Sequence, residues 1–107
     1  MAWFMIEASY TPAATKGLIS KPEDRSAAVR VMIEKAGGKL HHLFFTFGDC
    51  DVVALAELPD QEAAMAVSMT AAAAGHLSSY KTRELFTTAA AVSAMKKAAA
   101  LKLAIPG

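Results

Sequence analysis

Two carboxylates and a pair of histidines are the side chains of this chain best suited to acid–base chemistry. Glu7 and Glu57 each follow a strongly apolar run, and His41 and His42 adjoin at the start of another. A carboxylate or imidazole enclosed in an apolar cavity has a shifted pKa and can act as a general base. Glu7, Glu57 and His42 are therefore the candidate catalytic residues. The alternative is that both carboxylates lie near strand ends and stay solvated.

The two histidines are not expected to form a metal site. Neighbouring residues of a strand point to opposite faces, so His41 and His42 cannot readily share one ion, even with Asp49 or His76 nearby. No zinc spacing, nucleophile elbow, glycine-rich phosphate loop or haem signature occurs. We expect no metal and no cofactor.

A second group of polar side chains follows the first apolar run. Tyr10, Lys16 and Arg25 could gather at one end of a sheet, near a helix N-terminus suited to an anion. With Asp51 from a later turn, they are the candidate ligand-binding residues. The alternative is that Arg25 pairs with Asp24, Asp51 or a backbone carbonyl and only fixes the loop.

Composition limits the classes of protein to consider. A chain of 107 residues is expected to form one domain, 1–107. Eleven basic residues stand against ten acidic ones without a basic and aromatic run, which argues against nucleic acid. The lone Cys50 excludes an internal disulfide, and the N-terminus reads as neither signal peptide nor membrane span. We expect a cytoplasmic protein without a membrane partner.

Hydrophobic periodicity predicts the elements that position these residues. Residues 11–19 read as a loop with at most one helical turn, and Ser20-Lys21-Pro22-Glu23 reads as a helix start. Strands are predicted at about 2–10, 39–47, 51–58 and 76–86, and helices at about 20–36, 60–74 and 87–104. Strand, helix, strand, strand, helix, strand is the α+β, ferredoxin-like βαββαβ plan, with a core at 2–86 and an appended C-terminal helix.

Two helices can cover only one face of the four-stranded antiparallel sheet, so alternation assigns each strand residue to a face. The side chains predicted to face the helices are Phe4, Ile6, Ala8, Leu43, Phe45, Phe47, Val52, Ala54, Ala56 and Leu58. The opposite face carries an apolar patch of Trp3, Met5, Phe44, Val53 and Leu55. Such a patch usually marks an interface, and a symmetric dimer would bury two of them. Glu7 and Glu57 fall in one layer of this face.

The segment TFGDCDVVALAELPD, residues 46–60, resembles the Gly-x-x-Asp hairpin of the GYD-domain family. Tyr10-Thr11, Gly37-Gly38-Lys39-Leu40 and Glu57-Leu58-Pro59-Asp60 resemble further motifs of the family, and the agreement spans about residues 5–86. Cys50 stands where the aromatic residue of Gly-x-Tyr-Asp is usual, so any role of that ring is lost. The resemblance implies a dimeric α/β barrel in which two ferredoxin-like sheets close on each other. The resemblance implies no activity, because proteins that share a fold often have different functions.

Three functions stay open at this point. The first is a homodimer or higher oligomer that binds a small organic or anionic ligand between two sheets. The second is a cofactor-independent enzyme of the oxygenase or isomerase type, with Glu7, Glu57 or His42 as base. The third is an oligomer with a purely structural or accessory role.

Overall fold

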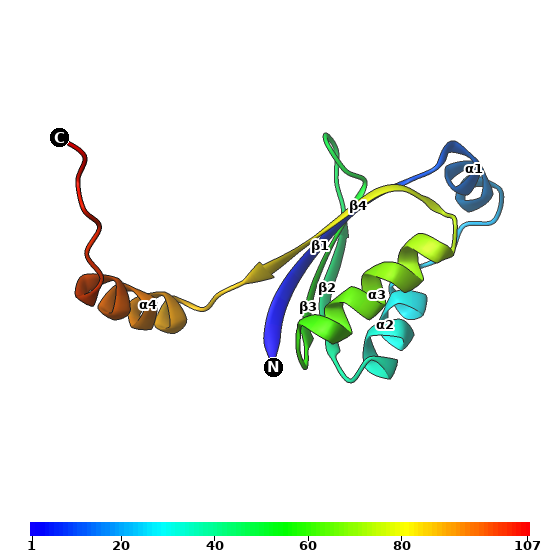
Figure 1. Ribbon diagram of the computed structural model, residues 1–107. Helices are drawn as coiled ribbons and strands as arrows, with labels where there is room; N and C mark the ends of the chain where they lie inside the picture. Colours follow the sequence, from blue (N-terminus) through cyan, green and yellow to red (C-terminus); the bar gives the residue numbers. More distant parts are fainter.

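A computed structural model describes all 107 residues of the chain. Its elements, in order, are β1 (Ala2–Tyr10), α1 (Pro12–Ser20), α2 (Ser26–Lys35), β2 (Lys39–Phe45), β3 (Val52–Leu58), α3 (Gln61–Ala73), β4 (Leu77–Leu85) and α4 (Thr88–Ala100). The strands form one antiparallel sheet in the order β2-β3-β1-β4. Helices α2 and α3 lie next to each other on one face of this sheet (Figure 1). The predicted α+β, ferredoxin-like arrangement is confirmed.

The core lies between the sheet and these two helices. Phe4 of β1 is buried there, as is every second residue of β3 from Val52 to Leu58. Ile33 of α2 and Val67 of α3 close the core from the other side. The predicted assignment of β1 and β3 side chains to the two faces is therefore confirmed. Side chains alternate between faces along each strand, so only one of the two possible assignments buries the apolar residues against the helices.

A bulge in β2 changes the alternation of that strand. Leu40 pairs with Ala56, but the next pair joins His42 to Leu55, so His41 is the extra residue. Beyond the bulge, Leu43 packs against the core and Phe44 faces away, as predicted. The prediction that Phe47 points toward the helices is wrong, because β2 ends at Phe45 and the Phe47 side chain is fully exposed.

The segment after β1 departs from the prediction of a loop. Residues 12–20 form helix α1, since the Thr11 hydroxyl accepts a hydrogen bond from the Ala14 amide at 3.1 Å and Pro12 fills the first turn. The predicted helix start at Ser20 is wrong. The chain leaves α1 there, and α2 begins only at Ser26, whose amide donates to the Asp24 carboxylate at 2.9 Å. The hydrogen bonds from Ser26 lower the pKa of Asp24.

The starts of α3 and α4 agree with the predicted helices, whereas α4 ends at Ala100 and not at the predicted residue 104. Asp60 accepts from the Ala63 amide at 2.8 Å at the start of α3, and Thr87 accepts from the Ala90 amide at 3.1 Å at the start of α4. Gly37, with a φ of 86°, ends α2.

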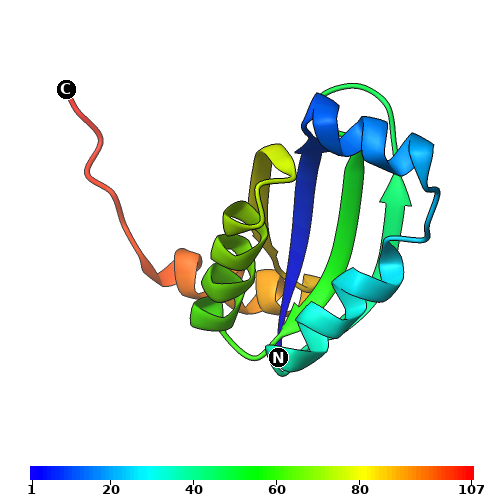
Figure 2. The same cartoon turned by 90° about the vertical axis from the view of Figure 1, so that its right-hand side faces the viewer.

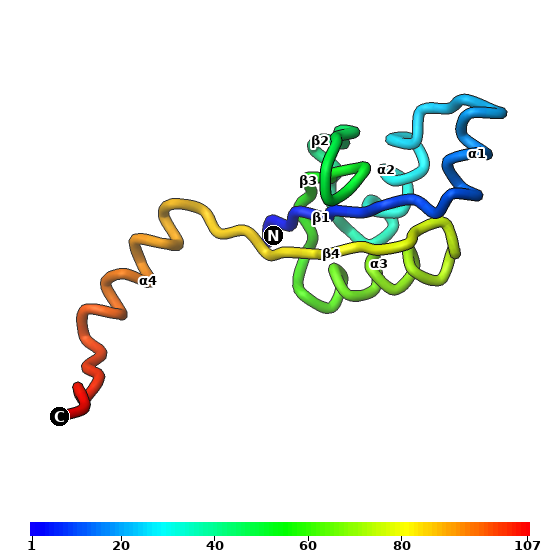
Figure 3. The backbone as a smooth tube through the Cα atoms, turned by 90° about the horizontal axis from the view of Figure 1, so that it is seen from above, coloured from blue at the N-terminus to red at the C-terminus, as the bar shows by residue number.

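Helix α4 stands away from the rest of the molecule. The chain leaves the end of β4 and carries α4 outward (Figure 1), and the view from above shows the same separation (Figure 3). None of its residues is buried. No helix of the chain combines the length and the apolar character that crossing a membrane requires.

Candidate functional site

The sheet face opposite α2 and α3 is the first candidate site. Figure 2 looks through the two helices onto the sheet, and Figure 1 shows no element packed on the far side, where α4 stands away from the sheet. Cross-strand pairing sets its residues side by side, because Met5 pairs with Leu55 and Phe44 pairs with Val53. The five predicted patch residues (Trp3, Met5, Phe44, Val53 and Leu55) lie together on this face, which we call the open face. Phe44 is its most exposed apolar side chain, at 61%.

The bulge in β2 brings an imidazole and a carboxylate together on the open face. Nε2 of His41 donates to Oε1 of Glu57 at 2.8 Å, and both side chains are about three-quarters buried. The Trp3 ring stacks on the His41 ring, with 4.4 Å between centroids. Because the bulge turns His41 to the same face as His42, the inference that adjacent histidines point to opposite faces is wrong here. No sequence signal marked His41 as the partner of Glu57.

The other two candidate bases lie in different surroundings. Oε2 of Glu7 is 3.3 Å from the Arg83 guanidinium of β4. Glu7 lies opposite Val53, and Glu57 lies four residues further along β3, so about 13 Å of strand separates them. The structure therefore does not bring the two carboxylates together. His42 stacks on Phe44, with 5.5 Å between centroids.

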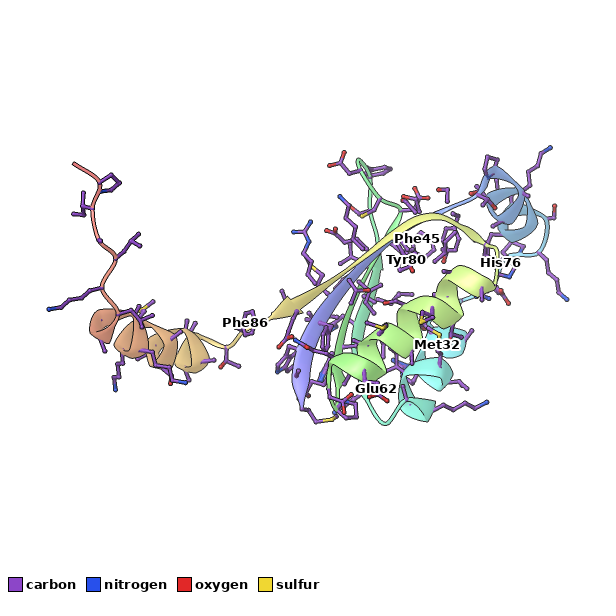
Figure 4. The ribbon with its side chains drawn as sticks, viewed as in Figure 1. Met32, Phe45, Glu62, His76, Tyr80 and Phe86 are labelled. Atoms are coloured by element: carbon purple, nitrogen blue, oxygen red, sulfur yellow. The ribbon has the colours of Figure 1, made fainter.

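Two adjoining cavities form a second candidate site, at the end of the sheet next to α1. The outer cavity has a volume of about 500 Å³ and is lined in part by Tyr10, Gly17, Lys21 and Arg25. The inner cavity, of about 200 Å³, lies between the sheet and helices α2 and α3. Both include Tyr10, Arg25 and His76 in their walls. Figure 4 shows His76 where α3 turns into β4, with Tyr80 further along that strand.

Of the four predicted ligand-binding residues, Tyr10 and Arg25 line these cavities, whereas Lys16 and Asp51 do not. Nη1 of Arg25 is 2.8 Å from the Glu23 carboxylate, and this hydrogen bond raises the pKa of Arg25. Asp51 instead stabilises the β2–β3 turn: its carboxylate accepts from the Tyr10 amide and its own amide donates to the Ala8 carbonyl, both at 2.9 Å.

Three titratable residues of the outer cavity were not among the predicted ligand-binding residues: Lys21, Glu23 and His76. His76 lies beside the outer cavity because its carbonyl accepts a hydrogen bond from the Thr11 amide at 2.9 Å. This contact joins segments 65 residues apart, and no local sequence motif predicts it. No three His, Cys, Asp or Glu side chains gather as a metal-binding group.

Comparisons with known proteins agree with this architecture. The family model described as the GYD domain matches residues 4–95. No curated protein matches the chain. The crystal structure of MtbAldR is similar, with a TM-score of 0.55 at 17% sequence identity over 80% of this chain and 52% of that one. The chain thus spans about half of that protein, and the likeness shows a shared fold alone.

Proposed function

This chain belongs to the GYD domain family, and we propose that two copies of it pack their open faces together around a small organic or anionic ligand. The observation that carries the proposal is the open face itself, where an apolar patch spans three strands with no covering element (Figure 1). Burial of an apolar patch of this extent stabilises an assembly, and a two-fold axis lets the patch of one chain cover the same patch of a second chain.

The size of the open face is sufficient for a dimer. Four strands of seven to nine residues cover roughly 500 Å² in each copy, at about 3.3 Å per residue and 4.8 Å between strands. Two such faces bury on the order of 1,000 Å², which reaches the minimum expected of a biological interface.

Polar groups on the open face support a ligand between the sheets. Each carboxylate already has one partner, Glu57 with His41 and Glu7 with Arg83. Lys81 lies opposite Glu7 on the same face and adds a second cation. Charged groups enclosed between two sheets need further hydrogen bonds, and an anionic or polar ligand would provide them to Arg83 and Lys81.

Substitution of Phe44 tests the dimer. Phe44→Glu places two carboxylates in the interface and is expected to shift the protein to monomers in sedimentation velocity at micromolar concentration. Val31→Glu is the matched control, because Val31 is a half-exposed residue of α2 on the other side of the sheet. Dimers that persist in Phe44→Glu, or monomers in both variants, would refute the interface.

The pairing of His41 with Glu57 supports a second candidate function, a cofactor-independent oxygenase. A carboxylate that accepts from Nε2 fixes the tautomer and leaves Nδ1 of His41 to take a proton from an electron-rich phenol. The phenolate would then donate electrons to dioxygen, and one oxygen atom would enter the ring to give a quinone while the other leaves as water. His41 thus replaces His42 as the preferred imidazole for this role.

Oxygen uptake with a dihydroxynaphthalene as probe tests this candidate. Glu57→Gln is expected to lower catalysed uptake at least tenfold while the probe still binds, and Glu62→Gln, an exposed change on α3, serves as control. If the unaltered protein consumes no more oxygen than buffer, the oxygenase is rejected and the binding function remains.

A further inference from the structure

We propose that each chain carries a ligand site of its own in the two adjoining cavities beside α1, and that this site takes a small amphipathic carboxylate. The carboxylate would bind at Arg25, and the apolar tail would extend between the sheet and helices α2 and α3. This site lies on the helix side of the sheet, so it is separate from the space between two open faces.

The shape of the cavities fits a ligand with two unlike ends. Tyr10, Arg25 and His76 belong to the walls of both cavities, so these residues form the passage between them. The outer volume of about 500 Å³ is within the range of small-molecule sites. The inner volume of about 200 Å³ continues from this passage between the sheet and the two helices and adds room for an apolar group.

The inner cavity selects an apolar group. Fifteen of its nineteen lining residues are hydrophobic, so a polar group entering it would lose its hydrogen bonds with water. Val29 and Met32 of α2 face Ala71 of α3 across this space, and Leu43 and Leu77 belong to the sheet side. An alkyl chain placed there is stabilised by the hydrophobic effect at each methylene.

The outer cavity selects a negative charge. Its ionised side chains are Arg25, Lys21 and Glu23, which leaves one excess cation, with the Tyr10 hydroxyl and the His76 ring beside them. Glu23 already places a carboxylate 2.8 Å from Arg25, and the Glu23 side chain is 55% exposed in the loop between α1 and α2. A ligand carboxylate can therefore displace Glu23 and take the same charge-assisted hydrogen bond.

Calorimetric titration of the full chain with octanoate, octanol and octylamine tests the site. We expect saturable binding of octanoate, at least tenfold weaker binding of octanol, and no binding of octylamine. Equal affinity for octanoate and octanol, or no saturable octanoate binding, would overturn the proposal.

Variants separate the two ends of the site. Arg25→Gln should weaken octanoate at least tenfold and leave octanol unchanged, whereas Lys16→Gln, an exposed cation of α1 outside both cavities, should change neither. Glu23→Gln should tighten octanoate severalfold, because it removes the competing carboxylate. If the Arg25–Glu23 pair only stabilised the loop, Arg25→Gln and Glu23→Gln would change the octanoate affinity in the same direction. That result would contradict the site.

Two further variants locate the ligand. Ala71→Phe fills the inner cavity and should abolish binding of octanoate and octanol with the circular dichroism spectrum retained. Phe44→Glu should bind octanoate as the unaltered chain does, because the site lies within one chain. Loss of binding in Phe44→Glu, or octanoate-induced amide shifts at Val53 and Leu55 instead of Leu77, would place the ligand between the sheets and refute this site. Failure here leaves the dimer untouched, since sedimentation tests the dimer separately.

Discussion

Asp51 illustrates, at the scale of a residue, how a polar side chain predicted to bind a ligand can instead hold the fold. Its carboxylate accepts from the Tyr10 amide, 41 residues away in sequence, and so fastens the β2–β3 turn to the end of β1. The residue could be identified from the sequence but its partner could not, because the hydrogen bond joins two distant segments. The same limit applies to His41, whose contact with Glu57 depends on a bulge that alternation alone does not reveal.

Removal of the Asp51 carboxylate should therefore affect stability. Asp51→Ala leaves the Tyr10 amide without its acceptor and is expected to lower the free energy of unfolding by about 2 kcal/mol. Asp49→Ala, in the exposed part of the same turn, is the control and should stay within about 0.5 kcal/mol. Urea unfolding measures both, and equal values for the two variants would contradict the role given to Asp51.

At the scale of elements, strands were predicted more reliably than the helix between β1 and α2. Alternation of Phe4, Ile6 and Ala8 reports directly on a half-buried strand. Pro12 and Gly17 suggested a loop, yet proline is favourable in the first helical turn and one interior glycine is tolerated. The cavities beside α1 could not be predicted for the same reason, since they depend on where that helix lies.

Two glycines, Gly38 in the turn between α2 and β2 and Gly17 inside α1, should respond in opposite directions to the same substitution. A methyl group on Gly38 would clash with the carbonyl oxygen of Glu57 and lie 2.7 Å from Cδ2 of Leu58, so Gly38→Ala should lower the free energy of unfolding by about 3 kcal/mol. Gly17→Ala in α1 meets no atom within 4 Å and should raise it by up to about 1 kcal/mol. Thermal unfolding followed by circular dichroism checks the pair, and a stable Gly38→Ala would contradict the close approach of the α2–β2 turn to β3.

At the scale of the whole molecule, two surfaces lack a partner within the chain. The open face is one, and helix α4 is the other: Phe86 in its linker is 72% exposed, and Met95 on the helix is 64% exposed. An isolated helix of 13 residues is only marginally stable in water, even when alanine-rich. A second copy would supply contacts to both surfaces, so the proposed function depends on the dimer.

Native mass spectrometry of the unaltered protein measures whether the dimer forms. At micromolar concentration and low ionic strength we expect a dominant species of twice the 11.2 kDa mass of one chain or an even multiple of it. A species of 11.2 kDa alone across the whole concentration range would contradict it.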